Sequence, residues 1–366
     1  MKLNIFIRHH INPSNYYRIY QYLNYIKEFH VVNVISSFPS FYYKYLGKCS
    51  KNKFLSILLK VITYPIVQLK LCLKISLMIF HPRSILFIQR EIYPRRLGFI
   101  QKKILSRLIN RNKIIWDIDD NILAINETSK AEFNLLSEKS ASIIVCHQFL
   151  KDCLDKKYIN KVVFLPTSDV ECAEFDLESA NQKRLIDYPK TVTLGWLGTF
   201  NNLRFLEKIL IYLDKSAGVL QKEFGKELIL RIVSDTRLEA SANFIKINNI
   251  LWTREVAVDE LKNIHIGLMP LDDNEITKGK CAFKAVQYMG FGIPVIASDV
   301  GFNREVIEDD RCGYLIKNNR TWSEKIIQLS TNENRWVQFS NSARSKWLND
   351  FNTDDIVKKI IKIIGR

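Results

Sequence analysis

Short β-branched runs alternate with longer amphipathic runs along the whole chain, and this alternation limits the possible folds more than any other sequence feature. It predicts a parallel sheet whose neighbouring strands are joined by crossover helices. We expect strands at 3–8, 31–36, 84–89, 113–118, 142–146 and 161–165 in the first half, and at 192–197, 228–234, 250–252, 266–270, 294–297 and 313–316 in the second. Helices are expected between them, for example at 14–28, 96–110 and 148–156.

The alternation pauses once, and the pause indicates a domain boundary. Residues 166–190 are polar and carry acids but little apolar periodicity, so we place a linker at 169–189. The flanking segments, 1–168 and 190–366, are then two α/β domains of similar size, each with a doubly wound parallel sheet. Ligands of such folds bind beyond the carboxyl ends of the strands, so we expect a central cleft between the two sheets.

The net charge of +16 comes from one region of the chain. Between Tyr42 and Lys113 there are sixteen lysines and arginines and a single acid, Glu91, which leaves 38 basic and 37 acidic residues in the rest of the sequence. The basic residues are interleaved with aliphatic side chains and not with the aromatic ones that stack on bases, which argues against nucleic acid as a partner. A positive face of this kind fits an anionic membrane surface.

One apolar run, 54–80, is long enough to be mistaken for a membrane span. It contains Pro65 and three lysines, which are costly at bilayer depth. The run therefore predicts an amphipathic helix, kinked at Pro65, and not a span. Its polar residues recur at helical intervals and would share one narrow face: Ser56, Lys60, Thr63, Lys70 and Lys74.

The cysteines and the N-terminus predict a cytoplasmic location. The seven cysteines form no C-x-x-C pair and mostly lie in apolar runs, as buried free thiols do. Residues 1–10 lack the long apolar segment and the cleavage site of a signal peptide. Together with the basic region, these features predict a peripheral protein on the inner face of the cell membrane.

The glycines place any phosphate-binding site in the second half of the chain. Only Gly47 and Gly98 occur in the first 194 residues, so a glycine-rich phosphate loop is excluded there. Five glycines crowd into 279–313, around a predicted helix at 282–289 whose start is flanked by lysines. Such a helix start favours a diphosphate, although an ordinary αβ unit with exposed lysines would show the same spacing.

The residues around this helix resemble the retaining GT-B glycosyltransferases of glycosyltransferase family 4. The nucleotide-sugar signature of that family is matched by Lys280-Cys-Ala-Phe-Lys284, by Gln287-Tyr-Met-Gly-Phe-Gly-Ile-Pro-Val-Ile-Ala-Ser298 and by Gly301-Phe-Asn-Arg-Glu305. Supporting segments lie in the expected order at 195–198, 266–271 and 313–315. In the first domain, a bacterial surface-polysaccharide branch is resembled by the segments 12–18, 89–91, 117–120 and 165–167.

The resemblance implies a GT-B fold of two Rossmann-like domains, with acceptor binding in 1–168 and donor binding in 190–366. It implies a glycosyltransferase that moves a hexose from a nucleotide-diphosphate sugar to a glycan or lipid-linked acceptor, with retention, in the synthesis of capsule or lipopolysaccharide. Two alternatives stay open. One is a GT-B-like nucleotide-sugar epimerase or phosphorylase, and the other is a non-enzymatic basic protein that binds nucleic acid or a membrane surface.

The resemblance also assigns the donor nucleotide to a set of residues around the signature: Gly198, Thr199, Asn201, Lys280, Cys281, Ala282, Phe283, Lys284 and Gln287. The sequence departs from the family at its two paired glutamates, which fall on Gly279 and Gln287. The amide of Gln287 can still hydrogen-bond to ribose hydroxyls. The missing carboxylate at Gly279 implies either that this branch orients the donor sugar differently, which we favour, or that the activity of the chain is altered.

We expect Lys280, Asp119 and Asp120 to be catalytic. Lys280 would stabilise the departing diphosphate without a metal, and one of the two aspartates would accept a hydrogen bond from donor sugar or acceptor while the other caps the next helix. Asp117 and Asp119 also spell the D-x-D pattern that binds metal in a different glycosyltransferase fold. We discount that reading because the second nucleotide-binding domain would then have no purpose. The acceptor side is assigned to residues at or after first-domain strands: Asn15, Arg18, Arg90 and Glu91.

Overall fold

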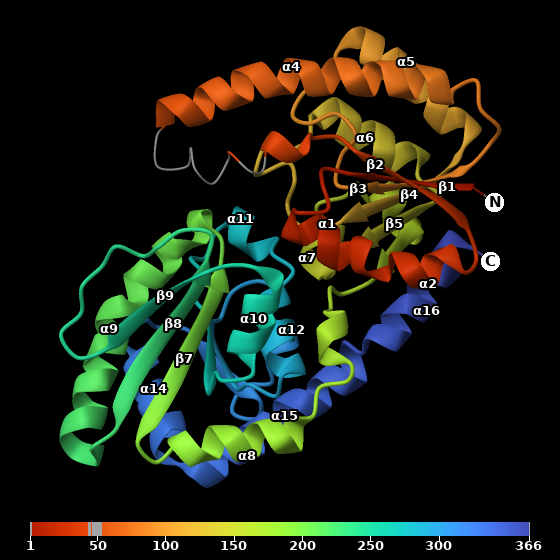
Figure 1. Ribbon diagram of the computed structural model, residues 1–366. Coiled ribbons are helices and arrows are strands. Elements are labelled where there is room, and N and C mark those ends of the chain that lie inside the picture. The colour runs from red at the N-terminus through yellow and green to blue at the C-terminus, as the bar shows by residue number, and fades with distance from the viewer. Residues whose placement is uncertain (1, 43–44, 46–52, 366) are drawn as a thin grey trace. The chain divides into compact units, whose positions relative to one another are not determined.

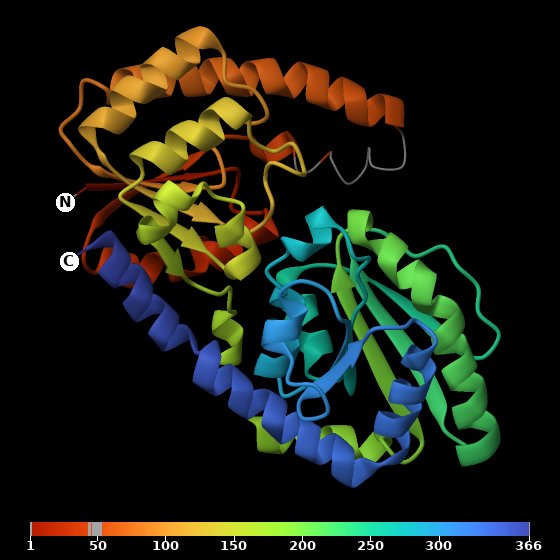
Figure 2. The same cartoon turned by 180° about the vertical axis from the view of Figure 1, so that it is seen from behind.

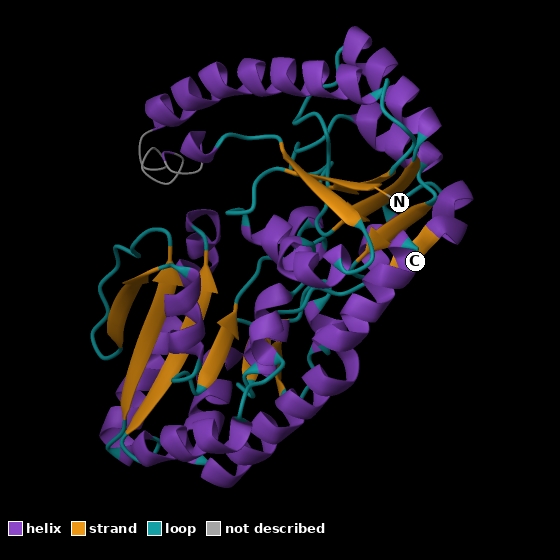
Figure 3. Ribbon diagram, turned by 45° about the vertical axis from the view of Figure 1, so that its right-hand side comes forward, coloured by secondary structure: helices purple, strands orange, loops and turns teal. Residues whose placement is uncertain are grey.

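The computed structural model describes residues 2–42, 45 and 53–365, and the chain divides into two compact units (Figure 1). The units consist of 1–167, 278–281 and 354–366 for the first, and of 168–277 and 282–353 for the second. Each unit contains a six-stranded parallel sheet with helices on both faces (Figure 3). The predicted α/β class with two doubly wound sheets is confirmed.

The first sheet has the strand order β2-β1-β3-β4-β5-β6. Its central strands are aliphatic and buried, as expected for strands that are covered on both faces. The register pairs Phe6 with Ile88 and Gln89 with Asp117, so the residues that follow β1, β3 and β4 emerge at one edge. The strands are β1 (Lys2–Ile7), β2 (Val31–Ser36), β3 (Ile85–Gln89), β4 (Lys113–Ile118), β5 (Ser142–Val145) and β6 (Val162–Phe164).

Helices α4, α5 and α6 lie on one face of the first sheet, and α1, α2 and α16 lie on the other (Figures 1 and 2). Val67, Leu105 and Leu136 belong to the core between the first three helices and the sheet. Helix α4 continues through Pro65. The helices are α1 (Pro13–Arg18), η1 (Tyr20–Tyr22), α2 (Leu23–Lys27), α4 (Lys53–Met78), α5 (Phe99–Arg111), α6 (Lys130–Lys139), α7 (Gln148–Asp152), η2 (Lys156–Lys161) and α16 (Thr353–Ile364).

The second sheet has the strand order β9-β8-β7-β10-β11-β12, which is the order of dinucleotide-binding Rossmann folds. Its strands are β7 (Thr191–Gly198), β8 (Glu227–Ser234), β9 (Lys246–Leu251), β10 (Ile266–Met269), β11 (Val295–Ser298) and β12 (Gly313–Ile316). The helices of this unit are η3 (Val170–Cys172), α8 (Leu177–Asp187), α9 (Phe200–Phe224), α10 (Arg254–Leu261), α11 (Glu275–Lys278, whose last residue belongs to the first unit), α12 (Phe283–Gly290), α13 (Asn303–Val306), α14 (Thr321–Thr331) and α15 (Glu333–Asp350).

Tyr288 anchors α12 to β7. Its hydroxyl donates to the carbonyl oxygen of Gly195 and accepts from the N–H of Leu197, each at 3.1 Å. Its ring lies against β10, where a Cβ on Gly267 would stand 2.5 Å from it, so this close approach requires glycine. Helix α12 and the last residues of β7 are consequently held close together.

The twelve predicted strands are all present, with ends that differ by a few residues. The strand expected at 250–252 is longer, because β9 already begins at Lys246. The helix expected at 14–28 is divided into α1, η1 and α2, and Ile19 between α1 and η1 has a non-helical backbone. These differences leave the order of the elements unchanged.

The domain boundaries differ from the expected ones, because 169–189 is a folded part of the second unit. The guanidinium of Arg184 in α8 holds this segment by donating to the carbonyl oxygens of Leu261 (2.9 Å) and Phe291 (3.0 Å). Because polar contacts hold this segment, its sequence shows little apolar periodicity and looks like a linker. At the other end of the chain, α16 belongs to the first unit from Asp354 onward, and it buries four apolar residues there: Ile356, Val357, Ile360 and Ile364.

Candidate active site

Each sheet has a point at which the strand order reverses, between β1 and β3 in the first and between β7 and β10 in the second. In open parallel sheets, ligands bind beyond the carboxyl ends of the strands at such points. Asn15 and Arg90 follow β1 and β3, while Gly198 ends β7 and Thr199 follows it. The predicted site residues therefore lie at the edges where a ligand is expected.

Lys284 lies beside Gly198 at this point of the second sheet. It is in the first turn of α12, and its ammonium is 4.9 Å from the centroid of the Trp196 ring. A Cβ on Gly198 would stand 2.9 Å from the Lys284 Nζ, so glycine leaves room for the ammonium at the end of β7. A full positive charge is thus held where a ligand of this sheet would bind.

Helix α9 begins at the same edge. Its N-cap, Thr199, makes no side-chain cap hydrogen bond, and Asn201 is exposed in the first turn. The carboxylate of Asp235 accepts from the N–H of Phe200 at 2.7 Å and so occupies part of this helix terminus. The N-terminus of this 25-residue helix carries a partial positive charge on the same unit as Lys284.

The predicted donor residues 280–284 are divided between the two units. Cys281 belongs to the first unit, where its thiol is hydrogen-bonded to Cys146. Ala282 belongs to the second unit and is buried with a left-handed backbone (φ 49°), directly before Phe283 opens α12. Such a conformation costs a non-glycine residue about 1–2 kcal/mol, and backbone strain of this kind is concentrated at functional sites.

Gln287 is buried, and its amide is bonded inside the second unit. Its Nε2 donates to Asp169 Oδ2 at 2.6 Å. Burial raises the pKa of Asp169 to about 6, although this hydrogen bond and one from the N–H of Glu171 oppose the rise. The amide therefore satisfies a buried carboxylate, and the expected contact of Gln287 with ribose stays a prediction.

Replacing Gln287 by alanine is expected to lower the free energy of unfolding by about 1–3 kcal/mol, because a buried acceptor loses its donor. The raised pKa means that the fold favours protonated Asp169, so the loss should be larger at about pH 8 than at about pH 5. Urea unfolding at both pH values measures this loss in the free energy of unfolding. Gln148→Ala is the matched control, since Gln148 donates to Asp152 at 2.7 Å on the surface. Equal effects of the two substitutions would contradict the prediction.

A buried ionic network fills the carboxyl edge of the first sheet. Arg90 holds Asp119 through Nε (2.6 Å) and Nη2 (3.0 Å), and it holds Glu127 through Nη1 (2.6 Å). Asp119 also accepts from Ser14 Oγ (2.5 Å) and Gln89 Nε2 (2.9 Å). Burial opposes the ionisation of Asp119, but the charges of Arg90 and Arg18 and the hydrogen bonds from Arg90 and Ser14 outweigh it and lower the pKa of Asp119 to about 2. Asp119 is an ionised group that positions Arg90.

Arg18 and Glu91, which were assigned to the acceptor side, face inward. Arg18 Nε donates to Asp117 Oδ2 at 3.0 Å, and its Nη2 donates to the second oxygen of the same carboxylate. Burial raises the pKa of Glu91 to about 7, while the guanidinium of Arg8, 2.5 Å away, opposes the rise. Arg18 is thus engaged with buried Asp117, and Glu91 with half-buried Arg8.

Asn15 is also buried, and its amide donates to Gln89 Oε1. The four predicted acceptor-side residues thus come together at one edge, as expected, but they bond to neighbouring side chains. Sequence reasoning missed two members of this network, Arg8 and Glu127. Arg8 follows β1 directly, as Arg90 follows β3, and that shared position was a usable signal. Glu127 lies in a loop whose path no sequence pattern indicated.

Asp120 differs from Asp119 because part of its side chain, 16%, is exposed. Its Oδ1 accepts from the N–H of Asn121 at 2.9 Å, and its Oδ2 is 3.6 Å from Arg90 Nη2. Burial raises the pKa of Asp120, and the positive charges of Arg90 and Lys280 oppose the rise. Of the two predicted aspartates, Asp120 is the one placed to meet a ligand.

Gly279 packs against the backbone that follows these aspartates. The segment 278–281 belongs to the first unit, and His147 Nε2 lies 3.4 Å from the Gly279 carbonyl oxygen. A Cβ on residue 279 would stand 2.6 Å from the Cβ and 2.8 Å from the N of Asn121. A side chain does not fit there, which is a steric reason for the absence of a glutamate at this position.

The D-x-D aspartates do not converge on a common point. Asp117 is bound by Arg18, and Asp119 is bound by Arg90. Among the residues that the structure describes, no group of three or more histidine, cysteine, aspartate or glutamate side chains is placed to hold a metal ion. Both carboxylates are used for ion pairing inside the first unit.

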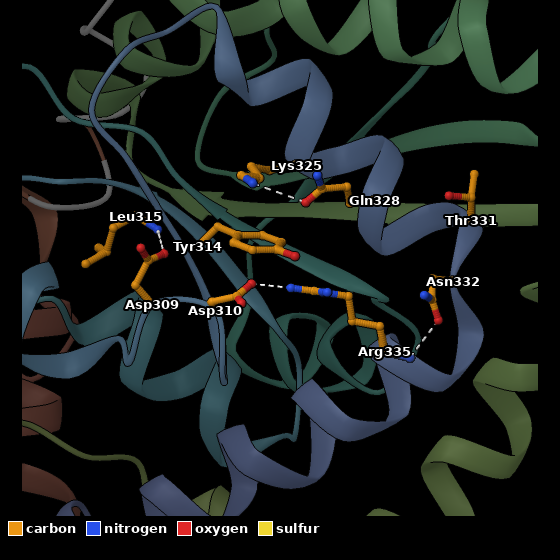
Figure 4. Close-up of a pocket in the computed structure, with 9 residues that line it drawn as sticks. All are labelled: Asp309, Asp310, Tyr314, Leu315, Lys325, Gln328, Thr331, Asn332 and Arg335. Carbon is orange, nitrogen blue, oxygen red and sulfur yellow. Dashed lines mark hydrogen bonds and ion pairs between the residues drawn. The ribbon is translucent and has the colours of Figure 1, made fainter.

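A pocket in the second unit lies apart from the predicted site residues (Figure 4). Asp309 and Asp310 precede β12 at the amino edge of the sheet, whereas Gly198 ends β7 at the carboxyl edge. The pocket is lined by residues of α14, α15 and the chain around β12: Asp309, Asp310, Tyr314, Leu315, Lys325, Gln328, Thr331, Asn332 and Arg335. Arg335 is paired with Asp310 inside this pocket.

Comparison with known proteins supports a glycosyltransferase domain in the second unit. Residues 191–332 match the family described as glycosyl transferases group 1. Glucosyltransferase 3 of Streptococcus parasanguinis is 27% identical over 127 residues, which are 34% of this chain and 37% of that protein. The chain therefore spans little more than a third of the length of this curated relative.

Two solved structures share the fold along nearly their whole length. HepE from Anabaena, in complex with UDP and glucose, superposes with a TM-score of 0.61 at 12% identity, covering 99% of this chain and 98% of that one. A glycosyltransferase from Rickettsia africae gives a TM-score of 0.62 at 14% identity, covering 99% and 97%. The chain has the GT-B fold. Its second unit contains a glycosyl transferase group 1 domain.

Proposed function

We propose that the protein is a glycosyltransferase that moves a hexose from a nucleoside diphosphate donor to a glycan or lipid-linked acceptor. The observation that carries this proposal is the position of Lys284 beside Gly198, inside the region that matches glycosyl transferases group 1. A diphosphate leaving group needs positive charge, and Lys284 with the N-terminus of α9 supplies it on one unit. The acceptor class follows the surface-polysaccharide resemblance of the first half.

The donor is proposed to carry UDP. HepE, which shares the fold, has been solved with UDP and glucose and with UDP-glucose. The transition state of glycosyl transfer is oxocarbenium-like, so the departing UDP must be stabilised while the acceptor hydroxyl is oriented. Lys280 and Lys284 meet the phosphate charge without a metal, and Asp120 accepts a hydrogen bond from the sugar or the acceptor. Retention and a cytoplasmic location are also part of the proposal: retention rests on the resemblance, and the location rests on the pattern of free cysteines.

Replacing Lys284 by alanine is expected to weaken UDP binding about tenfold or more and to leave uridine binding nearly unchanged, because a charge-assisted contact contributes about 1.5–3 kcal/mol. Lys280→Ala should act in the same direction. Isothermal titration of both variants with UDP and uridine measures the difference. Lys262→Ala is the control, since Lys262 is an exposed lysine of the second unit that pairs with Asp259 at 2.8 Å.

Wild-type affinity of Lys284→Ala for UDP would remove Lys284 from the donor site. Product analysis separates the alternatives: an epimerase would convert UDP-hexose without an acceptor, whereas a glycosyltransferase releases UDP only as glycoside forms. The same assay with EDTA tests the proposed independence from metal. Loss of transfer on adding EDTA would contradict it.

A further inference from the structure

Helix α4 turns an unbroken apolar row outward. Five of its residues recur at intervals of three or four and are between 53% and 66% exposed: Ile62, Ile66, Leu69, Leu73 and Leu77. The helix has 26 residues and is therefore about 39 Å long. It lies on the outer side of the first unit (Figures 1 and 2). Contiguous exposed apolar surface of this extent marks an interaction site.

The opposite side of α4 is part of the folded core. Thr63, Val67, Leu71 and Ile75 recur every four residues and are at most 1% exposed. The last three belong to the core that contains the strands of the first sheet. Among the described residues, α4 is the one helix long and apolar enough to cross a membrane, with 17% of that stretch buried. Crossing would pull its buried row out of the core, so α4 is suited to lie along a surface.

The polar stripe of α4 is not its outer face. The Lys70 ammonium donates to the carbonyl oxygen of Ser36 in β2 at 3.2 Å. Burial lowers the pKa of Lys74, and the charge of Lys70 adds to this effect. Lys70 is therefore held against β2 and Lys74 is half-buried, whereas the most exposed row of α4 is aliphatic.

Positive charge lies next to the outer row. Helix α5, which packs beside α4, exposes Lys102, Lys103 and Arg107 together with Phe99. The Lys103 ammonium is 4.4 Å from the centroid of the Phe99 ring. The single acid of the region between residues 42 and 113, Glu91, is buried against Arg8. The charges that this region exposes beside the outer row are therefore basic.

We propose that α4 lies in the plane of an anionic lipid bilayer, with its outer row among the acyl chains and the basic residues of α5 at the phosphates. A lipid surface offers apolar chains and negative charge side by side, which is the combination that α4 and α5 present. A second copy of this chain is a poorer occupant, because it would bring one basic region against another. The proposal goes beyond glycosyl transfer and does not depend on it.

The test is co-sedimentation of the full chain with vesicles of phosphatidylcholine alone or mixed with phosphatidylglycerol, without nucleotide. The α4 variant carries Ile62→Ser, Leu69→Ser and Leu73→Ser. Its matched control carries the same change at equally exposed apolar residues of the second unit: Ile186→Ser, Ile211→Ser and Leu251→Ser. The charge variant carries Lys102→Glu, Lys103→Glu and Arg107→Glu. Unchanged thermal melts establish that the variants are folded.

We expect the wild type and the matched control to bind mixed vesicles, and the α4 variant to bind about tenfold or more weakly at both low and physiological salt, because apolar insertion is not screened. The charge variant should lose binding mainly at low salt. Wild-type binding by the α4 variant would overturn the proposal. Failure of the wild type to sediment with either kind of vesicle would also overturn the proposal. A wild-type dimer that the α4 variant abolishes would overturn it as well, because the outer row would then be a contact between two copies of the chain. Donor binding is measured separately, so failure here leaves the Lys284 test intact.

Discussion

Replacing Arg18 by alanine is expected to lower the free energy of unfolding by about 3–5 kcal/mol, because it leaves the charge of Asp117 buried without its bidentate partner. Both side chains are 1% exposed. Arg18 also donates to the Leu165 carbonyl oxygen (2.8 Å) and to Thr167 Oγ1 (3.1 Å), so the substitution removes several bonds at once. Arg18→Lys should recover little, since an ammonium cannot reproduce the guanidinium fork. Urea unfolding followed by circular dichroism measures the loss.

Arg304→Ala is the matched control for this substitution. Arg304 pairs with Asp299 at 2.6 Å, but its side chain is largely in solvent, and pairs of this kind contribute about 1 kcal/mol or less. The double variant Arg18→Met, Asp117→Leu should regain part of the stability, because no buried charge is then left. A loss from Arg18→Ala as small as that from Arg304→Ala would show that the buried pair is not formed in solution.

Replacing Asp120 by asparagine is expected to reduce the rate of transfer about ten- to hundredfold, because a hydrogen bond to a charged acceptor contributes about 1.5–3 kcal/mol. The thermal midpoint should change little, since Asp120 is partly exposed and 3.6 Å from Arg90. For Asp119→Asn we expect a large fall in the thermal midpoint. That substitution weakens the paired hydrogen bonds from Arg90 and leaves its buried guanidinium without the charge of Asp119, so the main effect is a loss of stability. Steady-state rates with UDP-hexose and thermal melts separate the two effects.

Asp259→Asn controls for the loss of a carboxylate that has no contact with the candidate site. Asp259 is exposed and pairs with Lys262, so neither rate nor midpoint is expected to change. If the Asp120→Asn variant transfers hexose at the wild-type rate, Asp120 has no role in the mechanism. A reduced rate accompanied by an equally large loss of stability would instead make it a positioning residue.

The class of fold and the order of its elements were predictable from the sequence because both depend on neighbours along the chain. The run 113–118 contains the consecutive apolar residues Ile114, Ile115 and Trp116, which favour a buried parallel strand, and the structure has β4 there. The helix and the strand of the segment 280–298 were predictable for the same reason. Residues 280–298 carry the lysines, the helix and the following strand in one contiguous stretch, so their spacing could be read directly.

The domain boundary was harder to predict. The stretch 169–189 has polar residues and little periodicity, and nothing local distinguishes a mobile connection from a helix held by polar contacts. Arg184 forms those contacts with carbonyl oxygens contributed by α10 and the end of α12, far away in the sequence. Likewise, residues 354–364 were assigned to the second domain because they follow it along the chain, whereas they fold with the first unit.

What the sequence determined by itself was secondary structure, the two parallel sheets and the segment that carries the lysines, because patterns of three to seven residues encode them. Tertiary structure alone decided which charges are buried and with which partners. Arg18 meets Asp117 across 99 residues, and Gln287 meets Asp169 across 118. It also decided that α4 turns its aliphatic row outward. Burial and pairing depend on groups brought together by the fold, and a local pattern contains the charge of a residue but not its surroundings.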